Sequence, residues 1–196
     1  MSVVLAIKQD NKIYLGADSQ VTRGGTRLSL SNPNNYKIWK VKGVENCIIG
    51  SVGVLRDACV IRIMDNLIRQ NEITDETISF EYVVDRIVPR MKRELEEYGY
   101  LSKNEKFDGF DSSFLIAHKD KLYYIGSDAA VIEIDDCIAI GTGSNESLGS
   151  LLSTNNEDPL KRIIKAVKSS ATHDIYVDYP IIITDTESTE FSIINK

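Results

Sequence analysis

The residues best suited to chemistry stand at the start of the chain. Ser2 carries a hydroxyl and leads directly into an apolar run, residues 3–7. A second apolar run, residues 13–17, returns and ends in a turn that contains Asp18. A free hydroxyl is a weak nucleophile that needs an adjacent base. A hydroxyl residue that runs straight into a strand at the start of a chain is unusual in an enzyme core, so Ser2 is a candidate nucleophile, although serine on its own is a commonplace second residue.

Other chemistries find less support in the sequence. Thr142, within Gly-Thr-Gly-Ser, resembles a phosphate-binding loop but has no lysine after it. His173 stands next to Asp174, yet the Gly-x-Ser-x-Gly motif that would supply a triad serine is missing. Only one other histidine, His118, is present. We therefore expect no metal and no cofactor.

Composition limits the class of protein. The chain has 196 residues, enough for one domain, which we place at 1–196. A net charge of −6 argues against a nucleic-acid partner. No apolar run approaches the ~20 residues that cross a bilayer, and the start lacks the features of a secretory signal. The cysteines, each in an apolar stretch, are expected to be buried free thiols: Cys47, Cys59 and Cys137. These features predict a soluble cytoplasmic protein.

Strands dominate the first part of the chain and helices follow. Residues 3–7 and 13–17 predict a hairpin, and residues 22–35 predict a polar loop. Residues 37–41 and 47–52 are further strand candidates. Apolar residues at 3- and 4-residue steps then predict a helix from residue 54 to 68 and another from residue 80 to 95. Pro89 lies inside the second helix and should interrupt its hydrogen bonding.

The second part repeats this order. A loop at 99–110 precedes predicted strands at residues 114–117, 122–125, 131–134 and 137–140. Helices are predicted at 145–152 and 159–169, the latter with Pro159 in its first turn. Strands at 181–184 and 191–194 close the chain. Strand blocks alternating with helix pairs predict an α+β, four-layer αββα sandwich: two antiparallel sheets stacked face to face, flanked by helices.

A series of short motifs gives this architecture a family. The motifs are Ser2-Val3-Val4-Leu5-Ala6-Ile7, Gly16-Ala17-Asp18-Ser19-Gln20, Tyr36-Lys37-Ile38, Ile49-Gly50-Ser51-Val52-Gly53 with Asp57, and Ile140-Gly141-Thr142-Gly143-Ser144. In this order and spacing they resemble proteasome β subunits and HslV, the bacterial proteasome-like peptidase. The likeness extends from residue 2 to about residue 184. It implies the N-terminal-nucleophile (Ntn) hydrolase fold, with serine in place of the threonine usual in the family.

The resemblance also implies a role for each candidate residue. Ser2 is the expected nucleophile, and its own α-amine, freed by removal of Met1, is the expected base, with an ordinary pKa of about 7.7–8.0. Lys37 is expected beside the Ser2 oxygen, held by Asp18. The backbone N–H of Gly50 is the expected oxyanion hole. The expected supports of the amine are Thr142 and Asp174, although Val177 stands where the family usually has a hydroxyl residue.

Function and partners follow from the same resemblance. Val21, Asn35, Ile48 and Val52 match positions that line the family's first specificity pocket, so apolar side chains are expected before the scissile bond. The expected activity is a threonine-type, here serine, endopeptidase acting on peptides or unfolded proteins. The resemblance implies a homo-oligomeric ring, a hexamer or heptamer, single or doubled. An ATP-driven unfoldase resembling HslU is a candidate partner.

Two other hypotheses stay open at this point. In the first, Met1 is retained, no general base is freed, and the chain is an inactive structural subunit with the same fold. In the second, the chain is a small-molecule amidase of the same superfold that needs no ring.

Overall fold

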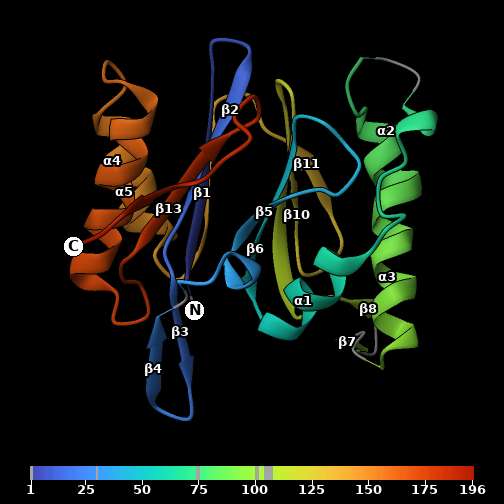
Figure 1. The fold of residues 1–196 in the computed structure, drawn as a ribbon, viewed down its shortest axis with the longest axis horizontal. Coiled ribbons are helices and arrows are strands. Elements are labelled where there is room, and N and C mark those ends of the chain that lie inside the picture. Colours follow the sequence, from blue (N-terminus) through green and yellow to red (C-terminus); the bar gives the residue numbers. More distant parts are fainter. Residues whose placement is uncertain (1, 30, 74–75, 100–101, 104–107) are drawn as a thin grey trace.

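The computed structural model describes residues 2–29, 31–73, 76–99, 102–103 and 108–196. Two five-stranded antiparallel sheets are stacked between two layers of helices, which confirms the predicted α+β sandwich (Figure 1). Among the described residues, no helix combines the length and the apolar character needed to cross a membrane.

The first sheet contains the N-terminus of the described chain. Its strand order is β12-β1-β2-β13-β14. The strands are β1 (Val3–Gln9), β2 (Lys12–Ala17), β12 (Cys137–Gly141), β13 (Ile181–Asp185) and β14 (Ser192–Ile194). Asp10 and Asn11, both with positive φ, form the two-residue turn of the predicted first hairpin. This hairpin places the start of β1 beside the end of β2.

The second sheet has the order β11-β10-β9-β6-β5. Its strands are β5 (Ile38–Lys40), β6 (Cys47–Gly53), β9 (Ser112–His118), β10 (Lys121–Ile125) and β11 (Val131–Glu133). Two short ribbons lie outside both sheets. They are β3 (Gln20–Arg23) with β4 (Thr26–Ser29), and β7 (Ser102–Lys103) with β8 (Asp108–Gly109).

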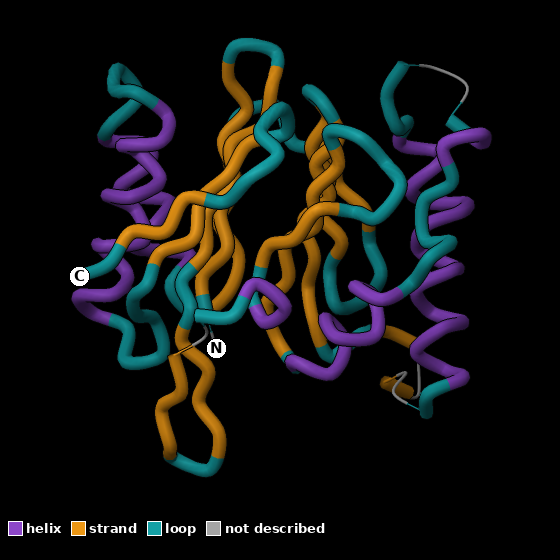
Figure 2. Tube along the Cα trace, in the orientation of Figure 1, coloured by secondary structure: helices purple, strands orange, loops and turns teal. Residues whose placement is uncertain are grey.

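The helices cover the two outer faces of the sandwich (Figure 2). α4 (Ser144–Ser153) and α5 (Pro159–His173) pack on the first sheet. On the second sheet lie α1 (Leu55–Ile63) and one long helix built from α2 (Phe80–Tyr82), the π-helical turn η3 (Val83–Ile87) and α3 (Val88–Glu97). Two 3₁₀ turns complete the set: η1 (Pro33–Asn35) and η2 (Gln70–Glu72).

Alternation along the strands explains the layers. Val3, Leu5 and Ile7 point toward α4 and α5, whereas Val4 and Ala6 point toward the second sheet. All five side chains are fully buried. Such a strand, apolar on both faces, fits only where both faces of the sheet are covered.

Several predicted elements differ from the structure. Residues 22–35, predicted as a loop, include most of the β3–β4 ribbon, because Gly24 and Gly25 both take positive φ and form a tight turn. The first helix ends at Ile63 rather than at 68. Pro89 interrupts the second helix as predicted: it lacks the N–H that would bond the backbone oxygen of Asp85, and the π-helical turn η3 ends two residues before it. Cys59 is exposed, so the prediction that all three thiols are buried was wrong.

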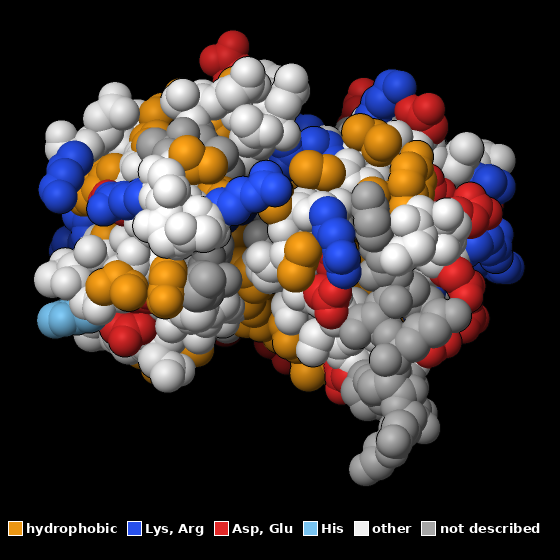
Figure 3. Space-filling model, turned by 90° about the horizontal axis from the view of Figure 1, so that it is seen from below, with side chains coloured by type: hydrophobic (Ala, Val, Ile, Leu, Met, Phe, Trp, Pro, Cys, Tyr) orange, Lys and Arg blue, Asp and Glu red, His pale blue; other side chains and the backbone are white. Residues whose placement is uncertain are grey.

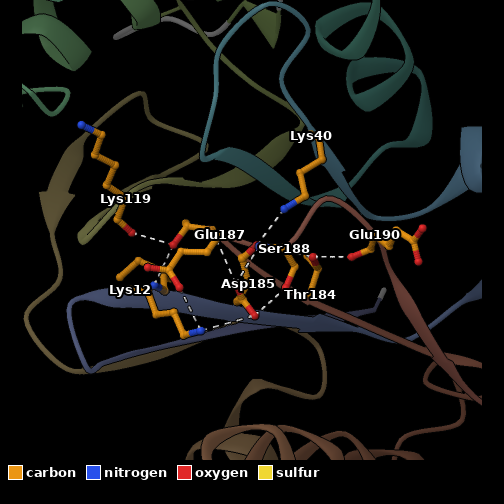
Figure 4. A network of polar contacts seen from close by, with 10 residues as sticks. Lys12, Lys40, Lys119, Thr184, Asp185, Glu187, Ser188 and Glu190 are labelled. Carbon is orange, nitrogen blue, oxygen red and sulfur yellow. Dashed lines mark hydrogen bonds and ion pairs between the residues drawn. The ribbon is translucent and has the colours of Figure 1, made fainter.

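A polar network joins the two sheets at the end where β1 finishes. Lys40 of β5 donates to the backbone oxygen of Asp185 at the end of β13, at 2.7 Å (Figure 4). The Asp185 side chain accepts from the backbone N–H of both Glu187 and Ser188. Thr186 Oγ1 accepts from Ile13 N and donates to Lys119 O, at 3.2 and 2.8 Å. Because Ser2 lies at the other end of β1, this network closes the end of the sandwich away from Ser2.

Candidate active site

Ser2 lies at the start of β1, buried between β12 and the loop that follows β2. Its backbone nitrogen donates to Thr142 Oγ1 at 3.2 Å, and its backbone oxygen accepts from Gly143 N at 3.3 Å. Ser2 is 5% exposed. The sheet register, with Val3 opposite Gly141, brings these distant residues together.

Asp18, in the loop after β2, contacts both Val3, which follows Ser2, and Lys37. Its Oδ1 accepts from Val3 N at 2.9 Å and from Lys37 Nζ at 2.7 Å. Its Oδ2 accepts from Gln20 N at 3.0 Å. Asp18 is fully buried. A carboxylate buried this deeply is tolerated because each oxygen has a partner.

Lys37, one residue before β5, is the cation of this pair. Its Nζ also donates to Gln20 O at 2.6 Å. Burial lowers the pKa of Lys37, and the nearby charges of Asp18 and Asp174 oppose that shift. A buried lysine with a lowered pKa can exchange a proton nearer to neutral pH than an exposed one.

The turn after β12 holds Thr142 against Ser2. Gly141 has a φ of +100°, and a side chain there would come within 2.2 Å of the Ser2 backbone oxygen. Only glycine allows this approach. Thr142 Oγ1 therefore lies within hydrogen-bond distance of both the nitrogen and the oxygen of Ser2, at 3.2 and 3.4 Å.

Asp174 caps the end of α5 near the same group of residues. Its Oδ1 accepts from Tyr176 N at 2.8 Å, and its buried Oδ2 has no hydrogen-bond partner among the described residues. Its charge raises the pKa of Lys37, which places it near the site. The structure thus brings together Ser2, Asp18, Lys37, Thr142 and Asp174.

Gly50 does not line the pocket that Ser2 lines, so the prediction that its N–H forms the oxyanion hole needs correction. Ser51 N donates to Lys37 O, so Ser51 directs its backbone groups toward β5. Because these directions alternate along a strand, Gly50 directs its N–H toward the paired strand β9. A side chain on Gly50 would meet Val4 Cγ1 at 2.7 Å, deep between the sheets. Its N–H is therefore not available to a substrate.

Gly53, three residues further along β6, lies beside the pocket instead. It has the same strand parity as Ser51, but β5 begins only at Ile38, so no residue of that strand lies opposite Gly53. Gly53 has a φ of +123° and lines the same pocket as Ser2. The two glycines are three residues apart, so the sequence indicates that their N–H groups point in opposite directions, but the pairing of β6 decides which of them faces the pocket.

The pocket beside Ser2 has a volume of about 250 Å³. Hydrophobic side chains are visible in the depression between the two halves of the molecule when it is viewed from below (Figure 3). The pocket is lined by Ser2, Val21, Thr22, Tyr36, Lys37, Ser51, Val52, Gly53, Val54, Leu55 and Ala58. Its wall is thus mostly apolar, and Lys37 is the charged side chain among these lining residues.

Two of the four predicted pocket residues line this pocket, Val21 and Val52, and two do not. Ile48 is fully buried in the core between the sheets, and Asn35 is exposed in η1. The sequence interpretation missed the contribution of α1, whose first turns supply Leu55 and Ala58. The glycine turn at the end of β6, directly before the predicted helix, was the available signal.

The match to a family of known proteins covers most of the chain. The family model described as "Proteasome subunit" matches residues 2–182.

Solved structures share the fold at low sequence identity. BPH of Thiobacillus denitrificans, in complex with epoxomicin, is similar with a TM-score of 0.74 and 19% identity, over 99% of this chain and 100% of that one. The eukaryotic HslV of Trypanosoma brucei is similar with a TM-score of 0.66 and 18% identity, over 93% of this chain and 98% of that one. Anbu, an ancestral β subunit from Yersinia bercovieri, is similar with a TM-score of 0.72 and 13% identity, over 99% of this chain and 87% of that one.

Proposed function

This chain belongs to the proteasome subunit family, and we propose that it is an Ntn peptidase that cleaves peptide bonds through an acyl-enzyme on Ser2. One observation carries the proposal. Ser2 opens onto a mostly apolar pocket together with Lys37, while its backbone nitrogen contacts Thr142 Oγ1. A nucleophile and a cation thus line one pocket, and a polar support contacts the nitrogen of the nucleophile.

The proposed reaction begins when Met1, which lies outside the described residues, is removed. The freed α-amine of Ser2 accepts the proton of the Ser2 hydroxyl as Oγ attacks the carbonyl carbon of the scissile bond. The C–N bond then breaks, the amine returns the proton to the leaving nitrogen, and an ester on Ser2 remains. Water, activated by the same amine, hydrolyses the ester. Lys37 stabilises the negative charge that develops on Ser2 Oγ when it attacks and again when it leaves the ester.

Gly53 is the proposed donor to the negative oxygen of the tetrahedral intermediate. Its strand parity directs its N–H to the side on which β5 has not yet begun, and it lines the pocket with Ser2. A donor of this kind typically contributes ~3–4 kcal/mol to lowering the barrier.

The pocket lining suggests the substrate. Val21, Val52, Val54 and Leu55 offer an apolar wall. We therefore propose peptides with a medium-sized apolar side chain before the scissile bond. Cationic side chains are disfavoured, because the pocket would desolvate them beside Lys37 without an acidic partner.

The proposal includes a ring-shaped homo-oligomer in the cytoplasm. The resemblance to proteasome β subunits and HslV implies such a ring, and the family match and the shared fold support this part of the proposal. A hexamer or heptamer, single or doubled, with an ATP-driven unfoldase as a partner, is the form we expect. Light scattering of the purified protein tests for the ring.

The activity test starts with the mass of the natively expressed protein, which shows whether Met1 is present. Fluorogenic peptides with an apolar residue before the reporter are then assayed with the wild type, Ser2→Ala and the control Ser153→Ala, a serine at the exposed end of α4. We expect cleavage by the wild type and the control only, and inhibition by epoxomicin. Equal rates for the wild type and Ser2→Ala would overturn the proposal. Retained Met1 without cleavage would support an inactive structural subunit.

A further inference from the structure

Two fully buried serines lie behind the turn that holds Thr142. Ser147 belongs to α4 and Ser170 to α5, and their Oγ atoms are 2.8 Å apart. Neither serine lines the pocket. Buried hydroxyls between packed helices cost stability unless they are hydrogen-bonded, so their partners are informative.

The hydrogen bonds of this pair have a direction. Ser170 Oγ donates to the backbone oxygen of Gly143 at 2.6 Å. A hydroxyl carries one hydrogen, so Ser170 must accept from Ser147, whose own hydrogen lies between Ser170 Oγ and Ala166 O, the latter at 3.1 Å. The pair therefore points from α4 through α5 to the Gly143 turn.

That turn is the support of Ser2. Gly143 N donates to Ser2 O, and the neighbouring Thr142 Oγ1 accepts from Ser2 N. A side chain on Gly143 would come within 2.8 Å of Ser170 Cβ, so the turn and α5 are in close contact. Ser170 is thus connected to Thr142 through one hydrogen bond and one peptide bond.

The backbone of Ser170 also contacts Asp174, the second polar residue near the site. Its backbone oxygen accepts from Asp174 N at 2.8 Å, at the end of α5. Val177, which has no hydroxyl to offer, packs against the same face of Gly143. Among the described residues that approach this face, Ser170 is thus the one that supplies a hydroxyl.

We propose that Ser170, backed by Ser147, is a positioning residue for the proposed reaction. It holds the Gly143 turn so that Thr142 Oγ1 meets the Ser2 nitrogen and orients the amine toward the Ser2 hydroxyl. Thr142 Oγ1 accepts a hydrogen from this nitrogen, so it favours the protonated amine and raises its pKa. The inference rests on the proposed function.

The test compares Ser170→Ala, Ser147→Ala and Thr172→Ala with the wild type. Thr172 is a matched control, because its exposed hydroxyl also donates to a carbonyl of α5, Lys168 O, at 2.8 Å. For Ser170→Ala we expect kcat to fall by about tenfold with KM nearly unchanged, since the pocket wall is untouched. The acid limb of the pH–rate profile should move to lower pH.

Ser147→Ala should lower kcat and move the acid limb of the pH–rate profile to lower pH, both by a smaller amount than Ser170→Ala. Thr172→Ala should change neither kcat nor the acid limb. Ser147→Ala also serves as the test if Ser170→Ala does not fold. Unchanged kcat and pH profile in the folded variants would overturn the inference, as would a loss of thermal stability alone.

Competitive acylation of the Ser2 amine across pH separates this inference from the proposed function. It reports the amine pKa without any peptidase activity, once Met1 is absent. A lower amine pKa in Ser170→Ala supports the positioning role even if no peptide is cleaved. An unchanged amine pKa in an active enzyme contradicts the positioning role alone.

Discussion

Lys37 Nζ lies 2.7 Å from Asp18 Oδ1, and both side chains are almost completely removed from solvent. The same Oδ1 accepts from the backbone of Val3, next to Ser2. One carboxylate oxygen therefore links the cation of the site to the strand that carries the nucleophile. Buried ion pairs of this kind contribute little net stability but are costly to break.

Breaking this pair should lower stability, and Lys37→Met should also lower kcat, because Lys37 lines the pocket with Ser2. Lys37→Met leaves the Asp18 carboxylate buried without its cation, which should cost about 3–5 kcal/mol of unfolding free energy. The double variant Lys37→Met/Asp18→Asn should lose less than the sum of the two single losses, with a coupling of about 1–3 kcal/mol. Urea unfolding of all four proteins measures this. Additive losses would show that the pair is not coupled.

The two glycines of β6 should respond differently to alanine. Gly50→Ala places a methyl 2.7 Å from Val4 Cγ1 and should cost about 1–3 kcal/mol of stability, with kcat per folded molecule nearly unchanged. Gly53→Ala meets the backbone oxygen of Asp111 at 2.5 Å and forces an unfavourable φ, so the turn must move. We expect kcat to fall at least ~100-fold. Peptidase assays corrected for the folded fraction distinguish the two sites, and a large kcat loss in Gly50→Ala would contradict this assignment.

Ala58 should limit the size of the accepted side chain. Ala58→Val extends a branched side chain into the pocket, so kcat/KM for peptides with a large apolar residue should fall about tenfold more than for those with alanine. Cys59→Val is the control, because Cys59 is exposed on the same helix and lies outside the pocket lining. Equal effects of both variants on all peptides would show that the pocket does not select the substrate.

The fold was predictable because its signals are local. Alternating strands, 3- and 4-residue helical steps and the Asp10-Asn11 turn are each visible in a short window of sequence. The β3–β4 ribbon was missed because its residues are mostly polar and its strands are four residues long. Only the Gly24-Gly25 pair indicated a tight turn there.

The site was harder to predict where it depends on strand parity. From the spacing of the motifs, Asp18, Lys37 and Thr142 were expected near Ser2. In the structure Thr142 contacts Ser2 N, and Lys37 contacts Asp18. Motif spacing could not choose between Gly50 and Gly53, because both are small and close in the chain. The choice depends on which neighbour each N–H faces, and that is set by the pairing of β6 with β5 and β9. Ile48 was misplaced for a similar reason: a position in the middle of a covered strand is core.

Acidification should destabilise the protein through His118. This histidine is 2% exposed, and its Nδ1 accepts from Ile78 N at 3.1 Å. Burial, reinforced by the charge of Lys119, lowers its pKa to about 4. Because the pKa of His118 is lower in the folded than in the unfolded state, its contribution to the free energy of unfolding is nearly constant above pH ~6.5. This contribution decreases as the pH falls below ~6.5. The loss between pH 6.5 and 5 should be about 1.5 kcal/mol.

Urea unfolding at several pH values checks this, with His118→Asn as the comparison. Asparagine keeps an acceptor near the position of Nδ1 but does not titrate, so the component of the pH slope between 6.5 and 5 that belongs to His118 should disappear. An identical slope in both proteins would assign the acid sensitivity to other groups.

Thr186 should affect stability without affecting the site. Its Oγ1 joins Ile13 N of the first sheet to Lys119 O beside the second, at the end of the sandwich away from Ser2. Thr186→Val keeps the shape but leaves both backbone groups without this partner, which should cost about 2 kcal/mol. Thr186→Ser, which keeps the hydroxyl, should lose clearly less. Both variants should keep the wild-type kcat at temperatures well below their melting points, because the pocket and the Lys37–Asp18 pair are untouched. A kcat loss in Thr186→Val matching that of Lys37→Met would mean that the spacing of the sheets, set at the far end, controls the geometry around Ser2.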